Sequence, residues 1–324
     1  MNGARSATCE KAINMPLVML AIAAFASVVA FMTFGLRGNI GFVLELRALK
    51  LLALVQVGVA IAVSTVLFQT ISGNRILTPS IMGLDALYLL CQTVLVLILG
   101  GLGFSSIDPI WKFGGEVAAM MALAFLLFLP MLKARIDLTL LLLSGVILGV
   151  LFRSLSQLVA RMIDPNDFAV LQGASFASFN SVRTDLLVAG TLITCIGCAV
   201  AWRARNTLDV LALGANTAIG LGVEWRRYVT AMLLLVAALV GVSTALVGPV
   251  AFFGLLVAAL GERIVKTQRH ALLLPAAALL AIIVLVGGQA ILQHMFGGAA
   301  TLGMIVEFIG GIVFVLMLLS AGKR

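Results

Sequence analysis

Long apolar runs follow one another along almost the whole of this 324-residue chain, and segment 231–247 is apolar at nearly every position. Such runs exceed what a single water-soluble core could cover. Apolar residues make up 62% of the chain and charged residues 10%, against about 45–50% and about 25% in an ordinary soluble domain. A helix needs about 20 residues to cross the hydrocarbon layer of a membrane. The sequence therefore predicts an all-helical membrane protein whose spans use most of the chain.

Several other classes of protein are excluded by the same patterns. A lipid-facing barrel has short segments of alternating hydrophobicity, whereas the runs here are continuous. The net charge of +8 is not gathered on a polar segment that could bind nucleic acid. Three of the four cysteines lie inside apolar runs, which indicates no disulfide framework. The sequence contains no nucleophile–base pair or metal-ligand pair that would indicate an intramembrane enzyme.

Hydropathy marks ten candidate spans, which form one transmembrane domain over residues 1–324. Both termini then lie on the same side of the membrane. Of the 21 Lys and Arg residues, 14 fall on that side and 7 on the other, and the positive-inside rule places the richer side in the cytoplasm. The predicted spans are 15–35, 48–70, 84–103, 115–132, 138–158, 184–201, 229–247, 250–265, 272–292 and 302–320.

The eighth predicted span is short, and Gly248-Pro249 stands directly before it. These residues interrupt helices. An interrupted helix at membrane depth must be surrounded by protein, because lipid cannot hydrogen-bond the freed backbone groups. The pattern predicts a broken helix that is buried at this point.

Two segments outside the spans are long enough to be structured. The outer loop, 160–183, contains Asp164-Pro165-Asn166-Asp167, which is a strong helix-start signal. The inner loop, 202–228, predicts two short helices joined by a glycine: a cap at Asn206-Thr207, a stop at Gly214 and a second start at Asn216-Thr217. Such a pair of amphipathic helices either lies on the bilayer surface or forms a docking surface for a partner.

Several candidate chemical motifs have a simpler explanation. Cys195 and Cys198 have the spacing of a metal or redox pair, but they lie in mid-span, where small residues favour helix packing. His270 and His294 lie at span ends that face opposite sides, and both are predicted to be interfacial polar residues. Segment 261–267 resembles a phosphate loop but has no glycine before its lysine. Any ATP must therefore bind to another subunit.

Three acidic residues, Asp85, Glu116 and Glu307, lie within or close to predicted spans. A charge costs about 2.5–3.5 kcal/mol at the centre of a membrane helix, so such residues suggest a function. Asp85 and Glu116 are near span ends, where water could reach them. Glu307 lies further inside the last span and is the candidate relay of a proton-coupled carrier.

Polar residues are concentrated in the second span, at Gln56, Ser64, Thr65 and Gln69. Ser144 repeats the pattern in the fifth span. Side chains of these types either hydrogen-bond between packed helices or line a wet path. We predict that the five residues lie along a translocation path, with helix packing as the alternative.

Five stretches of the chain together resemble one known family. Residues 46–50, 58–69 and 73–83 resemble the second-span signature of the iron-chelate and vitamin B12 (FecCD-like) ABC importer permeases, 211–223 resembles their cytoplasmic loop, and 248–257 resembles a later segment of the family. The sequence departs from the family pattern at Leu49, Lys50, Arg75, Ala215-Asn216 and Ala258-Ala259. Segment 83–88 and the form of 254–258 are more similar to permeases for catecholate siderophores.

The resemblance implies a type II ABC importer permease fold with ten spans and cytoplasmic termini. It implies that the inner loop is a pair of coupling helices that dock on an ATPase. It further implies that Arg47 and Lys50 meet acidic residues of a binding protein, where complementary charge orients docking. The implied coupling residues are Leu208, Leu211, Leu213, Gly214, Ala218, Leu221 and Gly222.

The predicted function is that of the permease subunit of an ABC importer that moves a ferric siderophore, of the catecholate class, across the bacterial cytoplasmic membrane. The subunit is not itself an enzyme and needs no cofactor or metal, because Mg-ATP binds to the partner ATPase. The implied partners are two ATPase subunits, a second permease subunit (a copy or a paralogue) and a periplasmic or lipid-anchored binding protein. The alternative is a proton-coupled secondary transporter with Glu307 as its relay.

Overall fold

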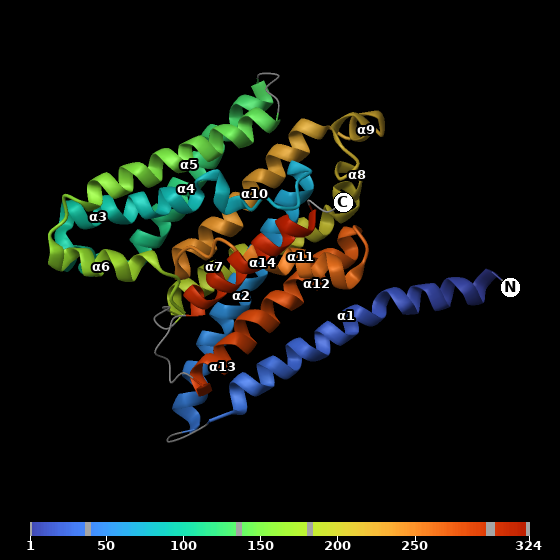
Figure 1. The fold of residues 1–324 in the computed structure, drawn as a ribbon, viewed down its shortest axis with the longest axis horizontal. Helices are drawn as coiled ribbons and strands as arrows, with labels where there is room; N and C mark the ends of the chain where they lie inside the picture. Colours follow the sequence, from blue (N-terminus) through green and yellow to red (C-terminus); the bar gives the residue numbers. More distant parts are fainter. Residues whose placement is uncertain (1, 36–39, 134–137, 180–183, 296–301, 322–324) are drawn as a thin grey trace.

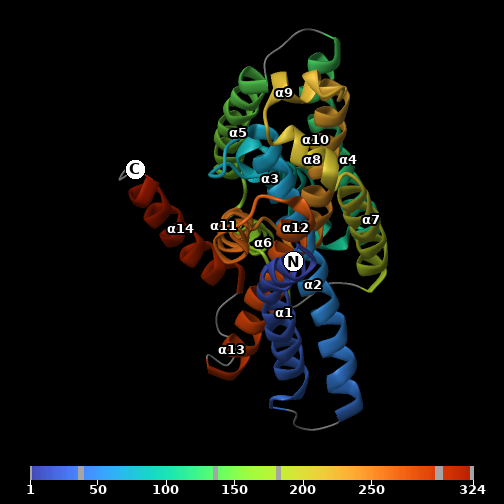
Figure 2. The same ribbon diagram turned by 90° about the vertical axis from the view of Figure 1, so that its right-hand side faces the viewer.

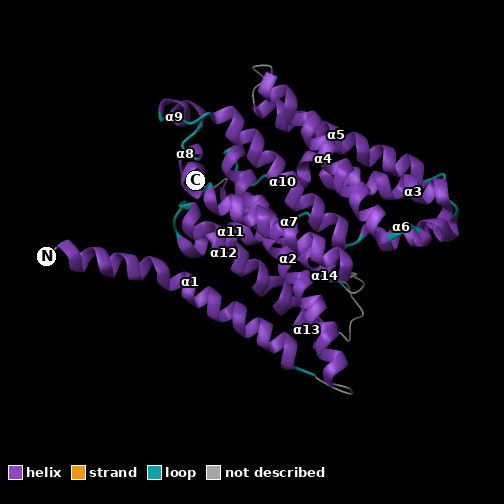
Figure 3. Cartoon of the chain, turned by 180° about the vertical axis from the view of Figure 1, so that it is seen from behind, coloured by secondary structure: helices purple, strands orange, loops and turns teal. Residues whose placement is uncertain are grey.

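The computed structural model describes residues 2–35, 40–133, 138–179, 184–295 and 302–321. Over these ranges the chain is helical and contains no strand (Figure 3). The first half contains α1 Asn2–Thr33, α2 Ile40–Ser72, the 3-10 turn η1 Pro79–Met82, α3 Leu84–Ser106, α4 Pro109–Lys133 and α5 Leu138–Ala160. The second half contains α6 Pro165–Ser175, α7 Thr184–Arg203, α8 Arg205–Leu211, α9 Ala215–Gly220, α10 Trp225–Val247, α11 Phe253–Val265, α12 His270–Ile282, the π turn η2 Ile283–Gly287, α13 Gly288–Met295 and α14 Leu302–Ala321.

Eight helices in the described part are long and apolar enough to cross a membrane, and they correspond to the first seven predicted spans and the ninth. The ninth span continues from α12 through the π turn into α13. The tenth is α14, which has an apolar run over Leu302–Leu316. The eighth is α11, whose 13 residues extend only about 20 Å. That length is short of the roughly 30 Å hydrocarbon core.

Helix α2 forms the centre of the molecule. Within its most apolar stretch 78% of residues are buried inside the chain, against 17% for α1 and 11% for α5. Helices α7, α10, α11 and α12 all pack against α2, as the views in Figures 1 and 2 illustrate. Because α2 is apolar on every side and enclosed by protein, its few polar side chains must find partners in neighbouring helices.

The predicted break before α11 is confirmed. Helix α10 ends at Val247, and Gly248 has a φ of 100°, a conformation that glycine adopts without steric cost. The backbone of the outer loop fits against this break: Ser178 N–H donates to the Val247 carbonyl at 2.7 Å. A Cβ at Gly248 would lie 3.1 Å from the Ala177 Cα. The interrupted backbone is therefore covered by protein, as a break at membrane depth requires.

Helices α3, α4, α5 and α6 form a group on one side of α10 (Figure 1). Helix α5 approaches the start of α3 closely, because a Cβ on Gly83 would lie only 2.8 Å from the Gly149 Cα. Helix α6 begins where the sequence predicts. The Asp164 carboxylate accepts a hydrogen bond from the Asn166 N–H at 3.1 Å, which satisfies one of the free donors at the helix start.

Candidate functional site

The inner loop folds into two short helices, α8 and α9, at one edge of the molecule beside the start of α10 (Figure 1). The joint is Gly214, with a φ of 94°, as the sequence predicts. Helix α9 ends in a Schellman motif: Val223 N–H bonds to the Ala218 carbonyl, and Gly222 N–H bonds to the Ile219 carbonyl. Gly222 occupies the left-handed position of that motif with a φ of 83°.

The predicted starts of the two inner helices need correction. Helix α8 begins at Arg205, and its N-cap is Ala204 rather than Asn206-Thr207. The reason is continuity with α7: the Ala204 N–H still bonds to the Val200 carbonyl, so the chain needs no side-chain cap there. Helix α9 begins at Ala215, directly after the glycine, rather than at Asn216.

The seven predicted coupling residues divide into two groups. Leu208, Leu211 and Ala218 are buried at 0%, 4% and 0% exposure. These side chains anchor the helices and cannot contact another subunit directly. Leu213 and Leu221 are 61% and 62% exposed, while Gly214 and Gly222 supply the turns. Ile219, a residue that the motif does not single out, is 59% exposed beside them.

We call Leu213, Ile219 and Leu221 the exposed triad. All three are large, exposed apolar side chains of a loop that is anchored by the buried side chains of Leu208, Leu211 and Ala218. A cluster of exposed apolar side chains with a rigid support is typical of an interaction surface. Helices α8 and α9 lie beside α10 (Figure 2), and the three side chains are exposed in the single chain.

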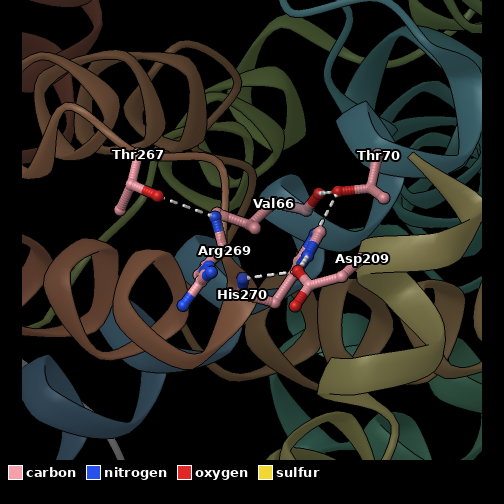
Figure 4. Close-up of polar contacts among 6 residues, drawn as sticks. All are labelled: Val66, Thr70, Asp209, Thr267, Arg269 and His270. Carbon is pink, nitrogen blue, oxygen red and sulfur yellow. Dashed lines mark hydrogen bonds and ion pairs between the residues drawn. The ribbon is translucent and has the colours of Figure 1, made fainter. Parts of the chain in front are cut away.

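Helix α8 is fastened to the bundle by a histidine that the sequence interpretation missed. His270, predicted to be an interfacial polar residue, is only 2% exposed. Its ring bonds to Asp209 of α8 on one side and to Thr70 of α2 on the other (Figure 4). The prediction was wrong because hydropathy places His270 at a span end but cannot reveal that α8 folds over it. Its partners are 61 and 200 residues away, so no local pattern could have found them.

A second polar link joins the end of α2 to α11. Arg75 Nη1 lies 3.0 Å from Glu262 Oε2, and Gln69 Nε2 donates to the Arg75 carbonyl at 2.7 Å. A polar cavity of about 140 Å³ lies beside this link, and Ala212 and His270 also line it. The inner ends of α2, α8, α11 and α12 therefore meet around one small polar cavity.

The predicted path residues of α2 are buried within the single chain. Gln56 Oε1 accepts from the Thr191 hydroxyl at 2.8 Å, and the Ser64 hydroxyl donates to the Ile61 carbonyl at 2.9 Å. Thr65 packs against Gly254, where no side chain would fit. The contacts of Gln56 and Thr65 join α2 to α7 and α11, as expected for helix packing, whereas the Ser64 bond stays within α2. A place along a translocation path stays a prediction.

Ser144 lies apart from that group on α5, which packs mainly against α3 and the 3-10 turn. Its side chain is half-buried. Most other large apolar side chains of α5, from Leu140 to Leu158, are exposed in the single chain. Ser144 therefore borders a helix face that lipid or another subunit must cover.

Arg47 has structural partners that its sequence motif did not predict. Its guanidinium donates to the carbonyls of Phe31 at 2.8 Å and Phe34 at 2.7 Å, with longer bonds to Met32 and Gly35. These carbonyls end α1, so Arg47 caps that helix and opposes the negative end of its dipole. Lys50 is half-buried one turn further along α2. Docking of a binding protein on this pair stays a prediction.

Two of the three acidic residues are more buried than the sequence indicates. Asp85 is 7% exposed and Glu116 is 5% exposed, so the expectation that water reaches them at span ends was wrong. Helix α4 begins at Pro109, six residues before the predicted span, which places Glu116 two turns inside the helix. Its carboxylate accepts a hydrogen bond from Gln92 Nε2 at 2.6 Å. Glu307 is half-buried and lies 3.5 Å from the Ala251 N–H.

The Cys195 side chain points outward on α7, and Cys198 is half-buried. Helix packing on this face is carried by Gly197, which lies against Leu239 of α10. Among the residues that the structure describes, no group of three or more His, Cys, Asp or Glu side chains could hold a metal ion.

Comparison with known proteins places these features in a family. The chain is 41% identical over 311 residues to the petrobactin import system permease protein YclO of Bacillus subtilis, covering 96% of this chain and 98% of that protein. It is 30% identical to the petrobactin import system permease protein FatC of Bacillus anthracis, covering 86% of this chain and 78% of that one.

The fold has a solved counterpart. A metal-chelate type ABC transporter in an inward-facing conformation superposes with a TM-score of 0.83, at 19% identity, over 94% of this chain and 99% of that chain. At that identity the likeness concerns the fold alone. Residues 17–320 match the model of the FecCD transport family, and the chain belongs to that family.

Proposed function

We propose that this chain is the permease subunit of an ABC importer for a ferric siderophore of the catecholate class. One observation carries the proposal: a relative that is 41% identical over nearly the full length of both chains is named as a petrobactin import permease. A second relative at 30% identity has the same designation. Iron–petrobactin is therefore the first cargo to test.

The permease works within a larger assembly. Its relatives are components of import systems, and such a system needs an ATPase, a second permease subunit and a binding protein that delivers the chelate. ATP and Mg²⁺ bind to the ATPase subunits. The assembly lies in the cytoplasmic membrane with both termini of this chain inside, an orientation supported by the 14-to-7 division of Lys and Arg residues.

The ATPase docks on the exposed triad of the inner loop. Leu213, Ile219 and Leu221 offer apolar area that a protein groove could cover, and their supports Leu208 and Ala218 are fully buried. A rigid support reduces the ordering cost of docking. The binding protein approaches the opposite face near Arg47 and Lys50, where charge complementarity would orient it.

The cargo is tested by deleting the gene in its host and measuring uptake of radioactive iron. Cells receive iron–petrobactin, a second ferric catecholate or a ferric hydroxamate, and vitamin B12 labelled with cobalt is supplied separately. We expect uptake of iron–petrobactin to fall to background and to return with a plasmid copy, while hydroxamate and vitamin B12 uptake stay unchanged. Unchanged iron–petrobactin uptake, or loss of vitamin B12 uptake, would contradict the proposed cargo.

A further inference from the structure

His270 joins three helices through one buried ring. It is the first residue of α12, Asp209 lies in α8 and Thr70 lies in the last turn of α2. Its Nδ1 atom is 2.7 Å from Asp209 Oδ1, and its Nε2 atom is 2.7 Å from Thr70 Oγ1. Figure 4 shows the ring between the two partners. Both ring nitrogens are thus engaged, each with a different helix.

Asp209 also caps α12 from outside that helix. Its Oδ1 atom accepts the backbone N–H of His270 at 2.8 Å. The residue at the N-cap position, Arg269, makes no capping hydrogen bond with its side chain. The first N–H groups of a helix need acceptors, and a carboxylate there is also favoured by the helix dipole. The start of α12 is therefore completed by a residue of the coupling loop.

Thr70 extends the link along α2. Its hydroxyl lies 2.8 Å from the Val66 carbonyl one turn earlier. The connection thus runs from the α8 carboxylate through the His270 ring to the Thr70 hydroxyl and the α2 backbone. The His270 side chain is 2% exposed and the Asp209 side chain is 35% exposed. The ring itself is therefore shielded from water, and hydrogen bonds in such surroundings are stronger than on a surface.

The link joins α8 to two helices of the packed interior, α2 and α12. Helix α2 is the central helix, and α12 packs along α2, α11 and α1. Helix α8, in contrast, belongs to the loop that carries the exposed triad. A displacement of α8 would therefore move the start of α12 and the end of α2 together, through directional contacts rather than apolar packing alone.

We propose that His270 is a positioning residue that transmits the movement of the coupling loop to α2 and α12. The inference rests on the proposed function, since it takes the ATPase as the source of that movement. Without the ring, α8 keeps its apolar anchors, Leu208 and Leu211, and still presents the exposed triad. The ATPase then binds and hydrolyses ATP, but less of each cycle reaches the central helices.

The test measures coupling in the full importer complex, reconstituted in proteoliposomes. The readout is the number of ATP molecules hydrolysed per iron–petrobactin imported. We expect His270→Ala and Asp209→Ala to raise that ratio by about tenfold, within the 5- to 150-fold range typical of coupling between sites. Bound ATPase and the hydrolysis rate should stay close to those of wild type. The double variant should be no worse than Asp209→Ala alone, because Asp209 makes both the bond to the ring and the cap of α12.

Two conservative variants separate transmission from folding. Asp209→Asn keeps an oxygen acceptor for the His270 N–H groups and should restore a ratio close to that of wild type. Thr70→Ser keeps the hydroxyl and should do the same. The matched control is Glu224→Ala, which removes an acid from the same loop. Glu224 pairs with Arg227 on the surface of α10 at 2.8 Å, with both side chains well exposed, and its loss should leave coupling unchanged.

The outcomes are distinguishable. If His270→Ala and Asp209→Ala complexes assemble and keep the wild-type ratio, the link is overturned. If either alanine variant does not assemble, the ATP-to-chelate ratio is measured in His270→Gln instead. This variant keeps a donor toward Thr70 but loses the ring. Wild-type coupling in His270→Gln together with an unchanged ratio in Thr70→Val would equally overturn the link. A wild-type complex that binds no ATPase would instead overturn the proposed function, and this inference with it.

Discussion

Replacing Leu221 by serine should weaken binding of the ATPase without destabilising the permease. Leu221 is 62% exposed in the single chain. Burying a whole leucine side chain is worth about 1.5–3 kcal/mol, so covering the exposed part contributes about 1–2 kcal/mol. Loss of that contribution corresponds to a drop in affinity of about 5- to 30-fold. Leu213→Ser should have a similar effect, because Leu213 is 61% exposed.

The assay is binding of purified ATPase to the permease complex in nanodiscs, measured as Kd, with thermal unfolding recorded on the same samples. Substitution of an exposed residue away from special features shifts stability by less than about 0.5 kcal/mol. The matched control is Met162→Ser, because Met162 is an apolar residue of the outer loop and is 69% exposed. Equal affinity for wild type, Leu221→Ser and Leu213→Ser would refute the docking surface. An equal loss in Met162→Ser would show that the effect is not local.

Three further outcomes follow from the packing. Arg47→Ala removes the hydrogen bonds that cap α1 and should lower the unfolding free energy by about 1–3 kcal/mol. The change is measured by thermal unfolding in detergent. An unchanged melting temperature would argue against the cap. Gly254→Ala forces a methyl group against Thr65 and should lower the unfolding free energy by about 1–3 kcal/mol. The control is Gly114→Ala, where an added methyl group meets open space, and its stability should not fall. Glu307→Gln should leave ATP-driven uptake intact; abolished uptake would favour a proton-coupled carrier.

The membrane spans could be predicted because their signal is local. Each long span is a continuous apolar run, and hydropathy alone locates eight of the helices that the structure contains in its described part. Gly248-Pro249 similarly predicts the break before α11 from two adjacent residues. Helix starts were less accurate. Side chains that resemble caps, such as Asn206, have no effect where the preceding helix simply continues, as α7 does into α8.

The site could be predicted only where a motif is contiguous. The inner loop was recognised because its leucines and glycines lie within one short stretch, but which of them face outward depends on how α8 and α9 pack. The role of His270 depends on two partners that are distant in the sequence. Arg47 is a similar case. A basic residue at the end of a span suggests a docking charge, but its hydrogen bonds to the carbonyls of α1 appear only in the fold.

Buried polar residues show the same limit. The sequence is equally consistent with a path-lining or a packing role for Gln56 and Thr65, because it does not show which helices surround α2. The fold settles their immediate contacts: Gln56 bonds to Thr191 of α7, and Thr65 lies against Gly254 of α11.

Uptake by the reconstituted complex tests the central claim most directly. The permease, its partner permease and the ATPase are placed in proteoliposomes with Mg-ATP inside, and labelled iron–petrobactin is added outside with its binding protein. We predict that the chelate accumulates only when hydrolysable ATP is present, and that a protonophore leaves the rate unchanged. Accumulation that needs a proton gradient and proceeds without ATP would contradict the account.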